Sequence, residues 1–258
     1  MNHSHNVLIV GAHHEEIEAE CPNIAAALSL AGCNVTILNP IGGWNWTFIR
    51  SLGTDGRERT IADATAAAKE LGCKKVIWDY PVAQVDRYKG EIMDRMAEFI
   101  THFQPEIVLM HWPLDSHADH RTVSLITHHV IMTARNIVPE NFTEYTDVKE
   151  VYAFQTGVSQ AYNFVPDFLV KADEQTMAMA ERAVHCFDNT AAASAKSWET
   201  NFRTKAAYWG NMAQQPAEAL KFLGPKLPLN GFLLAEILKD RIFRYPYQTW
   251  TSNPAFLM

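Results

Sequence analysis

Short apolar runs alternate with longer, periodically apolar segments along the first half of the chain. The short runs are rich in Val, Ile and Leu and predict buried strands, whereas apolar residues that recur every three or four positions predict helices. The predicted strands are residues 7–10, 35–38, 75–78 and 106–110, and the predicted helices are residues 23–31, 59–71, 91–103 and 121–135. Strands that are apolar on both faces and separated by helices form a parallel sheet covered on each side. The pattern therefore predicts an α/β fold, Rossmann-like and three-layer αβα, with a mainly parallel sheet.

The pattern of the second half is less regular. Asp173 is a good N-cap residue for the first helix expected there. The expected elements are strands over residues 148–154 and 164–170, and helices over residues 173–187, 195–212 and 232–238. Pro and Gly interrupt residues 216–231, where no element is predicted. Because no repeat, low-complexity tract or linker divides the sequence, we expect residues 1–258 to form a single domain.

Composition and charge narrow the class of protein. The chain has 258 residues, of which 48% are hydrophobic, and this is typical of a soluble globular protein. Its formal net charge is 22 − 29 = −7, without a basic run, so nucleic acid and anionic membranes are disfavoured as partners. No apolar run approaches the ~20 residues that span a bilayer. The start of the chain also lacks the basic region of a signal peptide, so we expect a cytoplasmic location.

Two groups of histidines and carboxylates follow predicted strands. Ala12-His13-His14-Glu15-Glu16 comes directly after residues 7–10, and residues 111–120, which end in His117-Ala118-Asp119-His120, come directly after residues 106–110. In a doubly wound sheet with the strand order 3-2-1-4, ligands bind at the carboxyl ends of the first and fourth strands. We therefore expect both groups to face one crevice.

Imidazoles and carboxylates together form the mixed nitrogen and oxygen ligand set that suits zinc. Two histidines and one carboxylate would leave a position for water, whose pKa zinc lowers toward ~7. A further carboxylate is suited to act as general base, and a histidine is suited to protonate a leaving amine. A histidine taken alone is more often solvated or hydrogen-bonded than functional. This applies to His111, His128, His129 and His185.

Residues 7–135 resemble the PIG-L (LmbE-like) zinc-dependent N-deacetylases. The first family motif, A-H-P-[DE]-D-E after the first strand, reads A-H-H-E-E-I over residues 12–17. The second, H-P-D-H at the start of a helix, reads H-A-D-H over residues 117–120. Residues 54–57, Thr-Asp-Gly-Arg, resemble the T-D-G loop of the family.

The resemblance implies a hydrolase that removes an N-acyl group, most often acetyl, from an amino sugar or glycoside such as an N-acetylglucosamine (GlcNAc) derivative. It implies that His13, Glu16 and His120 bind Zn²⁺ or another divalent cation, and that Glu15 is the general base. His117, oriented by Asp119, would protonate the departing amine or stabilise the oxyanion. Arg57 aligns with a family arginine that holds substrate hydroxyls.

The chain departs from the family at the first motif. Family members usually carry Asp at positions 15 and 16, so Glu15 and Glu16 each add one methylene while the Zn–O distance stays near ~2.0–2.2 Å. Either the backbone must retreat from the metal or the glutamate side chain must fold back. His14 replaces the family proline and adds a further imidazole to this loop.

Other enzyme classes fit less well. An H-E-x-x-H metalloprotease would need His where Glu18 stands, Gly11 is not part of a G-x-G-x-x-G turn, and no G-x-S-x-G elbow occurs. The alternative that stays open is a catalytically silent relative that binds a metal or a sugar-like ligand for regulation or assembly.

Two aromatic groups also leave alternatives open. Trp44, Trp46 and Phe48 suit either a sugar-stacking wall or ordinary packing. The aromatic residues near the C-terminus suit either the interface of a homo-oligomer or a cover for the sheet. They are Trp198, Phe202, Tyr208, Trp209, Phe243, Tyr245, Tyr247 and Trp250.

Overall fold

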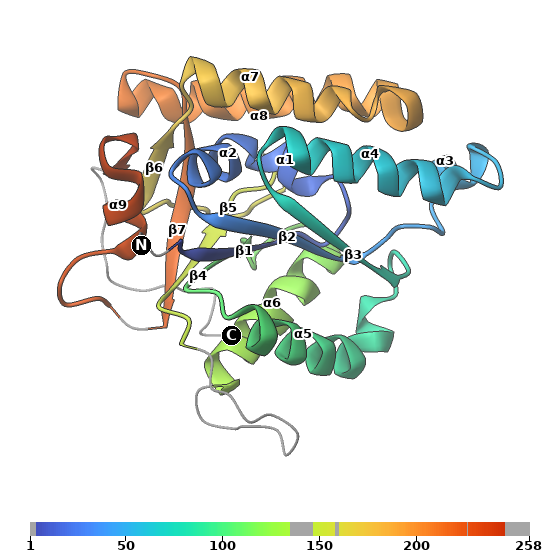
Figure 1. The fold of residues 1–258 in the computed structure, drawn as a ribbon, viewed down its shortest axis with the longest axis horizontal. Coiled ribbons are helices and arrows are strands. Elements are labelled where there is room, and N and C mark those ends of the chain that lie inside the picture. Colours follow the sequence, from blue (N-terminus) through green and yellow to red (C-terminus); the bar gives the residue numbers. More distant parts are fainter. Residues whose placement is uncertain (1–3, 135–146, 158–159, 226, 246–258) are drawn as a thin grey trace.

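The strands belong to one mixed sheet with helices on both faces (Figure 1). This computed structural model describes residues 4–134, 147–157, 160–225 and 227–245. Arg135, Tyr247 and Trp250 lie outside the described residues. The described strands are β1 (Asn6–Val10), β2 (Asn34–Ile41), β3 (Lys74–Tyr80), β4 (Ile107–His111), β5 (Glu150–Phe154), β6 (Phe168–Lys171), β7 (Ala217–Pro225) and β8 (Ile242–Arg244).

The strand order of the sheet is β3-β2-β1-β4-β5-β7-β6-β8. The pairs from β3 to β5 are parallel, and β7 and β8 pair antiparallel with their neighbours. The expected 3-2-1-4 order and the mainly parallel three-layer fold are confirmed. Val10 pairs with Met110, so the carboxyl ends of β1 and β4 lie next to each other.

Helices cover both faces of the sheet. In Figure 1, α1, α2, α4, α7 and α8 lie on one side of it, and α5 and α6 lie on the other. The described helices are α1 (Glu16–Glu20), α2 (Pro22–Leu30), α3 (Thr47–Ser51), α4 (Gly56–Glu70), α5 (Lys89–Phe103), α6 (Ala118–Ala134), α7 (Glu174–His185), α8 (Asp188–Ala213) and α9 (Leu233–Leu238), with 3₁₀ turns η1 (Val85–Tyr88) and η2 (Lys239–Arg241). None of the helices in the described ranges combines the length and apolarity needed to cross a membrane.

The apolar runs are continuous because both faces of the central strands are buried. Along β1, Val7 and Ile9 belong to the core beneath α2 and α4, while Leu8 and Val10 belong to the core beneath α5 and α6. All four side chains are completely buried. Two separate cores thus hold β1 rigidly, and this rigidity positions the loop that follows it.

The structure corrects the interpretation of residues 216–231. We predicted no element there, yet β7 runs between β5 and β6. Pro216 precedes this strand, and Gly224 and Pro225 lie at its end. Pro and Gly are tolerated at the ends of a strand, where a missing backbone donor or side chain weakens the sheet little. They therefore mark the ends of β7 rather than interrupt it. The pattern also failed to indicate the short elements α1, α3 and β8.

The aromatic residues of α8 serve the fold. Phe202 is fully buried against α7, and Trp209 packs on residues of β6 and β7. Tyr208 beside them is exposed. Phe202 and Trp209 are therefore packing residues of the interior, and Trp209 covers the sheet, which is one of the two roles considered for this aromatic group. A homo-oligomer stays a prediction.

A buried ion pair ties α1 to β3. Lys75 Nζ lies 2.8 Å from Glu18 Oε1, and both side chains are fully buried. Removing one partner leaves an uncompensated buried charge, so Lys75→Met is expected to lower the free energy of unfolding by about 3–5 kcal/mol. Urea denaturation measures this loss.

The Glu18→Leu/Lys75→Met double variant removes both charges, and most of the lost stability is expected to return. Lys74→Met, at the exposed neighbouring position, is the matched control. A Lys75→Met protein as stable as the unaltered chain would show that this pair does not secure α1.

Candidate metal centre

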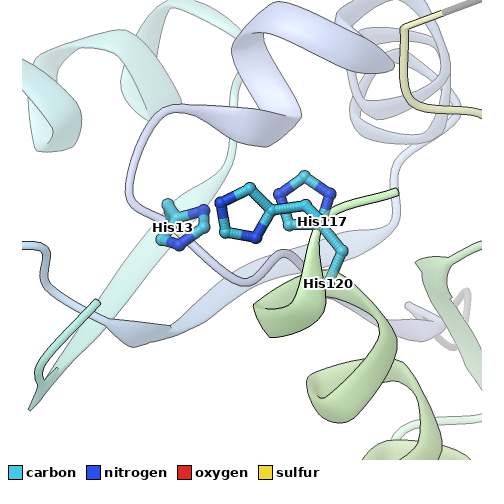
Figure 2. Close-up of side chains that lie close together, drawn as sticks. All are labelled: His13, His117 and His120. Atoms are coloured by element: carbon cyan, nitrogen blue, oxygen red, sulfur yellow. The ribbon is translucent and has the colours of Figure 1, made fainter. Parts of the chain in front are cut away.

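Two loops bring the histidine-rich groups together at the carboxyl ends of β1 and β4. The loop after β1 carries His13, and the residues at the start of α6 carry His117 and His120 (Figure 2). The ring centroid of His13 lies 4.9 Å from that of His117 and 5.3 Å from that of His120. The expected shared crevice is therefore formed, because β1 and β4 are neighbours in the sheet.

The Glu16 carboxylate lies at the centre of this cluster. Its Oε1 atom is 2.6 Å from both His13 Nδ1 and His120 Nε2. Its Oε2 atom accepts hydrogen bonds from the backbone amides of Ala12, at 2.5 Å, and His13, at 3.0 Å. Oε2 also lies 2.5 Å from His111 Nε2. The two carboxylate oxygens thus have separate sets of partners.

The Glu16 side chain folds back, and this is how the extra methylene is accommodated. Its carboxylate returns to amides three and four residues earlier in the chain. Gly11 leaves the space for it, since a Cβ there would lie 3.2 Å from Glu16 Oε2 and 2.7 Å from Asn39 Nδ2. Of the two possibilities raised by the sequence, the folded side chain is the one observed.

The negative charge of Glu16 and the positive charges of the His13 and His120 imidazoles stabilise one another. Burial alone would raise the pKa of Glu16, but the imidazoles of His111, His120 and His13 hold it well below its usual value. Burial opposes protonation of His13 and His120 as well, yet the Glu16 carboxylate raises the pKa of His13 to about 9 and that of His120 to about 10. Near neutral pH these imidazoles therefore keep protons that a bound cation would displace.

The donor atoms fit a divalent cation. Among the described residues, two sets of three donors lie within 4.8 Å of one another: His13, His117 and His120, and Glu16, His111 and His120. His13, Glu16 and His120, the set implied by the resemblance, supply two nitrogens and one oxygen, a donor set that zinc favours. Replacement of two imidazole protons by a divalent cation would also preserve the charge balance of this buried site.

A carboxylate oxygen lies near the second ring nitrogen of both His13 and His120. Asp119 Oδ2 lies 3.1 Å from His13 Nε2 and accepts a hydrogen bond from the backbone amide of Ala83 at 2.8 Å. Asp115 Oδ2 lies 3.1 Å from His120 Nδ1. Such carboxylate–histidine pairs are typical of metal sites, because they fix the tautomer and turn the free nitrogen toward the ion.

The contacts of Asp119 differ from our expectation. We expected its carboxylate to orient His117, but the carboxylate contacts His13 instead. The backbone amide of Asp119 donates to His117 Nδ1 at 3.2 Å. His117 therefore accepts at Nδ1 and carries its hydrogen on Nε2. Burial and the nearby His120 and His13 lower the pKa of His117, which favours the neutral ring.

Glu15 lies in the loop after β1, between His14 and Glu16 in the chain. Its Oε2 atom is buried, lies 3.4 Å from His14 Nδ1 and has no hydrogen-bond partner among the described residues. Burial raises the pKa of Glu15 to about 7, near the value suited to a general base at neutral pH. His14 packs against the ring of Trp44 at a centroid distance of 6.1 Å, and burial lowers the pKa of His14 to about 3. His14 is therefore a neutral packing residue in this structure.

The part of the chain that forms this site is similar to a known family. The PIG-L family profile, described as GlcNAc-PI de-N-acetylase, matches residues 8–131. This match shows what residues 8–131 are similar to. A search of curated proteins gave no match. The matched residues contain both histidine-rich groups, all of β4 and the last three residues of β1.

Several solved structures share this fold. A conserved protein of Thermus thermophilus is 21% identical, with a TM-score of 0.70 over 87% of this chain and 97% of its own. The N,N'-diacetylchitobiose deacetylase of Pyrococcus horikoshii is 18% identical, with a TM-score of 0.70 over 84% and 83%. The 4-carboxy-2-hydroxymuconate hydratase of Pseudomonas putida is 18% identical, with a TM-score of 0.68 over 88% and 100%. These similarities establish the fold and leave the reaction to be argued from the site.

Aromatic residues of the loop after β2 line one side of the histidine cluster. The ring centroid of Trp46 lies 4.8 Å from that of His13. Arg57 is farther out: its guanidinium lies 5.3 Å from the ring centroid of Trp44 and 2.5 Å from Asp79 Oδ1. Arg57 is therefore an exposed residue at the rim, and within the described part of the chain its side chain pairs with Asp79 rather than with the clustered histidines.

The sequence analysis placed His111 and Asp115 in the second group but gave neither residue a role in the site. His111 is completely buried and touches Glu16, and Asp115 is buried against His120. The sequence did indicate a role for His111. An imidazole at the end of a wholly apolar, buried strand needs a polar partner in the interior. Asp115 carried no such signal, since an aspartate in a loop is common for turn chemistry alone.

The pKa shifts predict how the stability of the metal-free protein depends on pH. The pKa of His13 is raised above its ordinary 6.5 to about 9 and that of His120 to about 10. Their contribution is therefore complete below pH 6.5 and lost as the pH rises through 9 and 10. We expect chelator-treated protein to lose on the order of a few kcal/mol of unfolding free energy between about pH 6.5 and 10.

Urea unfolding at both pH values measures this loss. Glu16→Gln removes the carboxylate that raises both pKa values, so this variant is expected to show a much smaller difference. Equal stability of the unaltered metal-free protein at the two pH values would contradict the paired cluster.

Proposed function

We propose that the chain is a zinc-dependent hydrolase that removes an N-acyl group, typically acetyl, from an amino sugar or glycoside. The convergence of His13, Glu16 and His120, with Glu15 next to Glu16 in the same loop, is the observation that carries this proposal. The PIG-L match over residues 8–131 supports it, and so does the shared fold of a chitobiose deacetylase. Another divalent cation with the same ligand preferences would serve the same chemistry.

His13 Nδ1, Glu16 Oε1 and His120 Nε2 would hold the cation, which when bound would polarise the acyl carbonyl and activate water. Glu15 accepts the proton of the attacking water and then delivers it to the nitrogen of the substrate as the C–N bond breaks. The products are a carboxylic acid and a free amine. Because Glu15 Oε2 makes no hydrogen bond to the described residues, it is available to accept this proton.

His117 is assigned to the oxyanion. Its Nδ1 accepts from the Asp119 amide, so its Nε2–H is the group left to donate. A neutral imidazole with a lowered pKa is a poor source of a whole proton but a good hydrogen-bond donor to an oxygen that gains charge. Of the two roles considered for His117, this arrangement favours stabilisation of the tetrahedral intermediate over protonation of the amine.

A screen for amine release tests the function directly. The chelator-treated protein is reloaded with zinc and incubated with N-acetylated mono- and oligosaccharides, and free amine is detected with fluorescamine. We expect release that requires added metal. Zinc binding without release from any substrate would favour the catalytically silent relative, and failure to bind any divalent cation would contradict the metal centre.

Arg57 is proposed to hold substrate hydroxyls from the rim of the site. Its exposed guanidinium is anchored by Asp79 and lies over Trp44. In the same assay, Arg57→Ala is expected to raise KM several-fold and to leave kcat nearly unchanged, since a remote contact stabilises ground state and transition state alike. An unchanged KM would remove Arg57 from the binding site.

A further inference from the structure

His111 lies outside both motifs of the cluster, at the last position of β4. The four residues before it, Ile107–Met110, are apolar and completely buried, and His111 is completely buried as well. Its ring lies parallel to that of His120, with a centroid distance of 4.4 Å and an angle of 7°, and it contacts Phe154 at 4.7 Å. Packing therefore holds the ring in one orientation.

The polar contact of this ring is directed at Glu16. His111 Nε2 lies 2.5 Å from Glu16 Oε2. An ionised carboxylate only accepts hydrogen bonds, so the ring hydrogen is on Nε2. The Ala12 amide, 2.9 Å from Nε2 and 2.5 Å from Oε2, then donates to the carboxylate. Oε2 consequently has Ala12, His13 and His111 as its three donors.

The other ring nitrogen distinguishes this residue from an ordinary buried histidine. His111 Nδ1 is buried and has no hydrogen-bond partner among the described residues. Buried polar side-chain atoms are usually paired, and an unpaired one needs an explanation. A residue selected for its contact with Glu16 would tolerate this cost, whereas a residue selected for stability would be replaced by an apolar one.

We propose that His111 is a positioning residue of the metal centre: it holds Oε2 of Glu16 so that Oε1 alone faces the cation between His13 and His120. This inference rests on the proposed metal-dependent function. It explains how a glutamate serves at a position where an aspartate is usual. The longer side chain can rotate, and His111 together with the two amides prevents that rotation.

The competing role for His111 is direct coordination, because Glu16, His111 and His120 form one of the two donor sets. Glutamine distinguishes the two roles. Its amide nitrogen can take the place of His111 Nε2 and donate to Oε2, but a side-chain amide nitrogen is not a zinc ligand. His111→Gln therefore preserves positioning and removes coordination, while His111→Ala removes both.

Cobalt titration of the metal-free proteins provides a readout that does not depend on activity. The affinity for Co²⁺ is measured by competition with a chelator, and the visible absorption bands report the ligand set. For His111→Ala we expect roughly 10–100-fold weaker binding, the usual cost of losing a partner that orients a ligand. His111→Gln is expected to bind within a few-fold of the unaltered chain and to give the same spectrum.

Each other outcome overturns the inference. A His111→Gln protein that binds as weakly as His111→Ala and has an altered spectrum would make His111 a ligand. A His111→Ala protein with unchanged affinity would make it a packing residue. His128→Ala, on α6, controls for loss of an imidazole elsewhere, and circular dichroism checks folding. Should His111→Ala not fold, His111→Asn, whose amide is too short to reach Oε2, replaces it.

The unaltered chain separates this inference from the proposed function. If it binds cobalt and releases no amine, the deacetylase function fails while the role of His111 is still decided by the variants. If it binds no cobalt, both proposals fail together.

Discussion

Glu15→Gln is expected to keep the metal bound and to lower kcat for amine release by roughly 10²–10⁴-fold, the contribution typical of a general base. Glutamine has nearly the same shape as glutamate but cannot accept the proton of the attacking water. Because Glu15 Oε2 makes no hydrogen bond to the described residues, the substitution should leave the fold undisturbed. Single-turnover kinetics and elemental analysis of the same sample measure the two quantities.

The pH profile provides a second readout of this residue. Burial raises the pKa of Glu15 to about 7, so kcat should fall as the pH drops below neutrality and the carboxylate becomes protonated. Glu58→Gln, on α4, is the matched control. An active Glu15→Gln enzyme with an unchanged acidic limb would exclude Glu15 as the base.

His120→Ala is expected to abolish metal retention. His120 Nε2 lies 2.6 Å from Glu16 Oε1, and Asp115 Oδ2 lies 3.1 Å from Nδ1 on the other side of the ring. The binding free energy of a four-ligand zinc site is ~10–16 kcal/mol. If each ligand contributes equally, loss of one ligand weakens binding roughly 10²–10³-fold. Dialysis against a weak chelator followed by elemental analysis should find zinc in the unaltered chain and little in the variant.

His129→Ala, on the same helix and exposed, controls for the loss of a histidine from α6. Retention of one zinc per chain by His120→Ala would falsify the assignment of His120 as a ligand. The activity assay then becomes informative in its own right, since an inactive variant that keeps its metal would point to a role for His120 in the reaction instead.

The position of the site could be predicted from the sequence because it depends on which strands are buried on both faces. The runs at residues 7–10 and 106–110 are apolar on both faces, and such strands are central in a parallel sheet. Once these two strands are central neighbours, the groups after them must meet at the carboxyl edge. The pairing of β1 with β4 and the contact between His13 and His120 follow from this reasoning.

The partners of each side chain could not be predicted in the same way. Asp119 and His117 are close in sequence, which suggested a pair, but the start of α6 directs the carboxylate toward His13. Asp115 reaches His120 through a turn whose geometry depends on Thr156, a residue 41 positions later. Hydrogen bonds are short and directional, so they depend on rotamers and on segments that no local pattern connects.

The amino-acid sequence by itself determined the layers, the order of the first strands and the edge at which histidines gather, because hydrophobic periodicity records which faces are buried. Only the tertiary structure decided that β7 lies between β5 and β6, that Glu16 folds back on its own loop, and that His111 contacts its carboxylate. These features depend on contacts between distant residues at a precision of a few tenths of an ångström. Burial patterns carry no information at that scale.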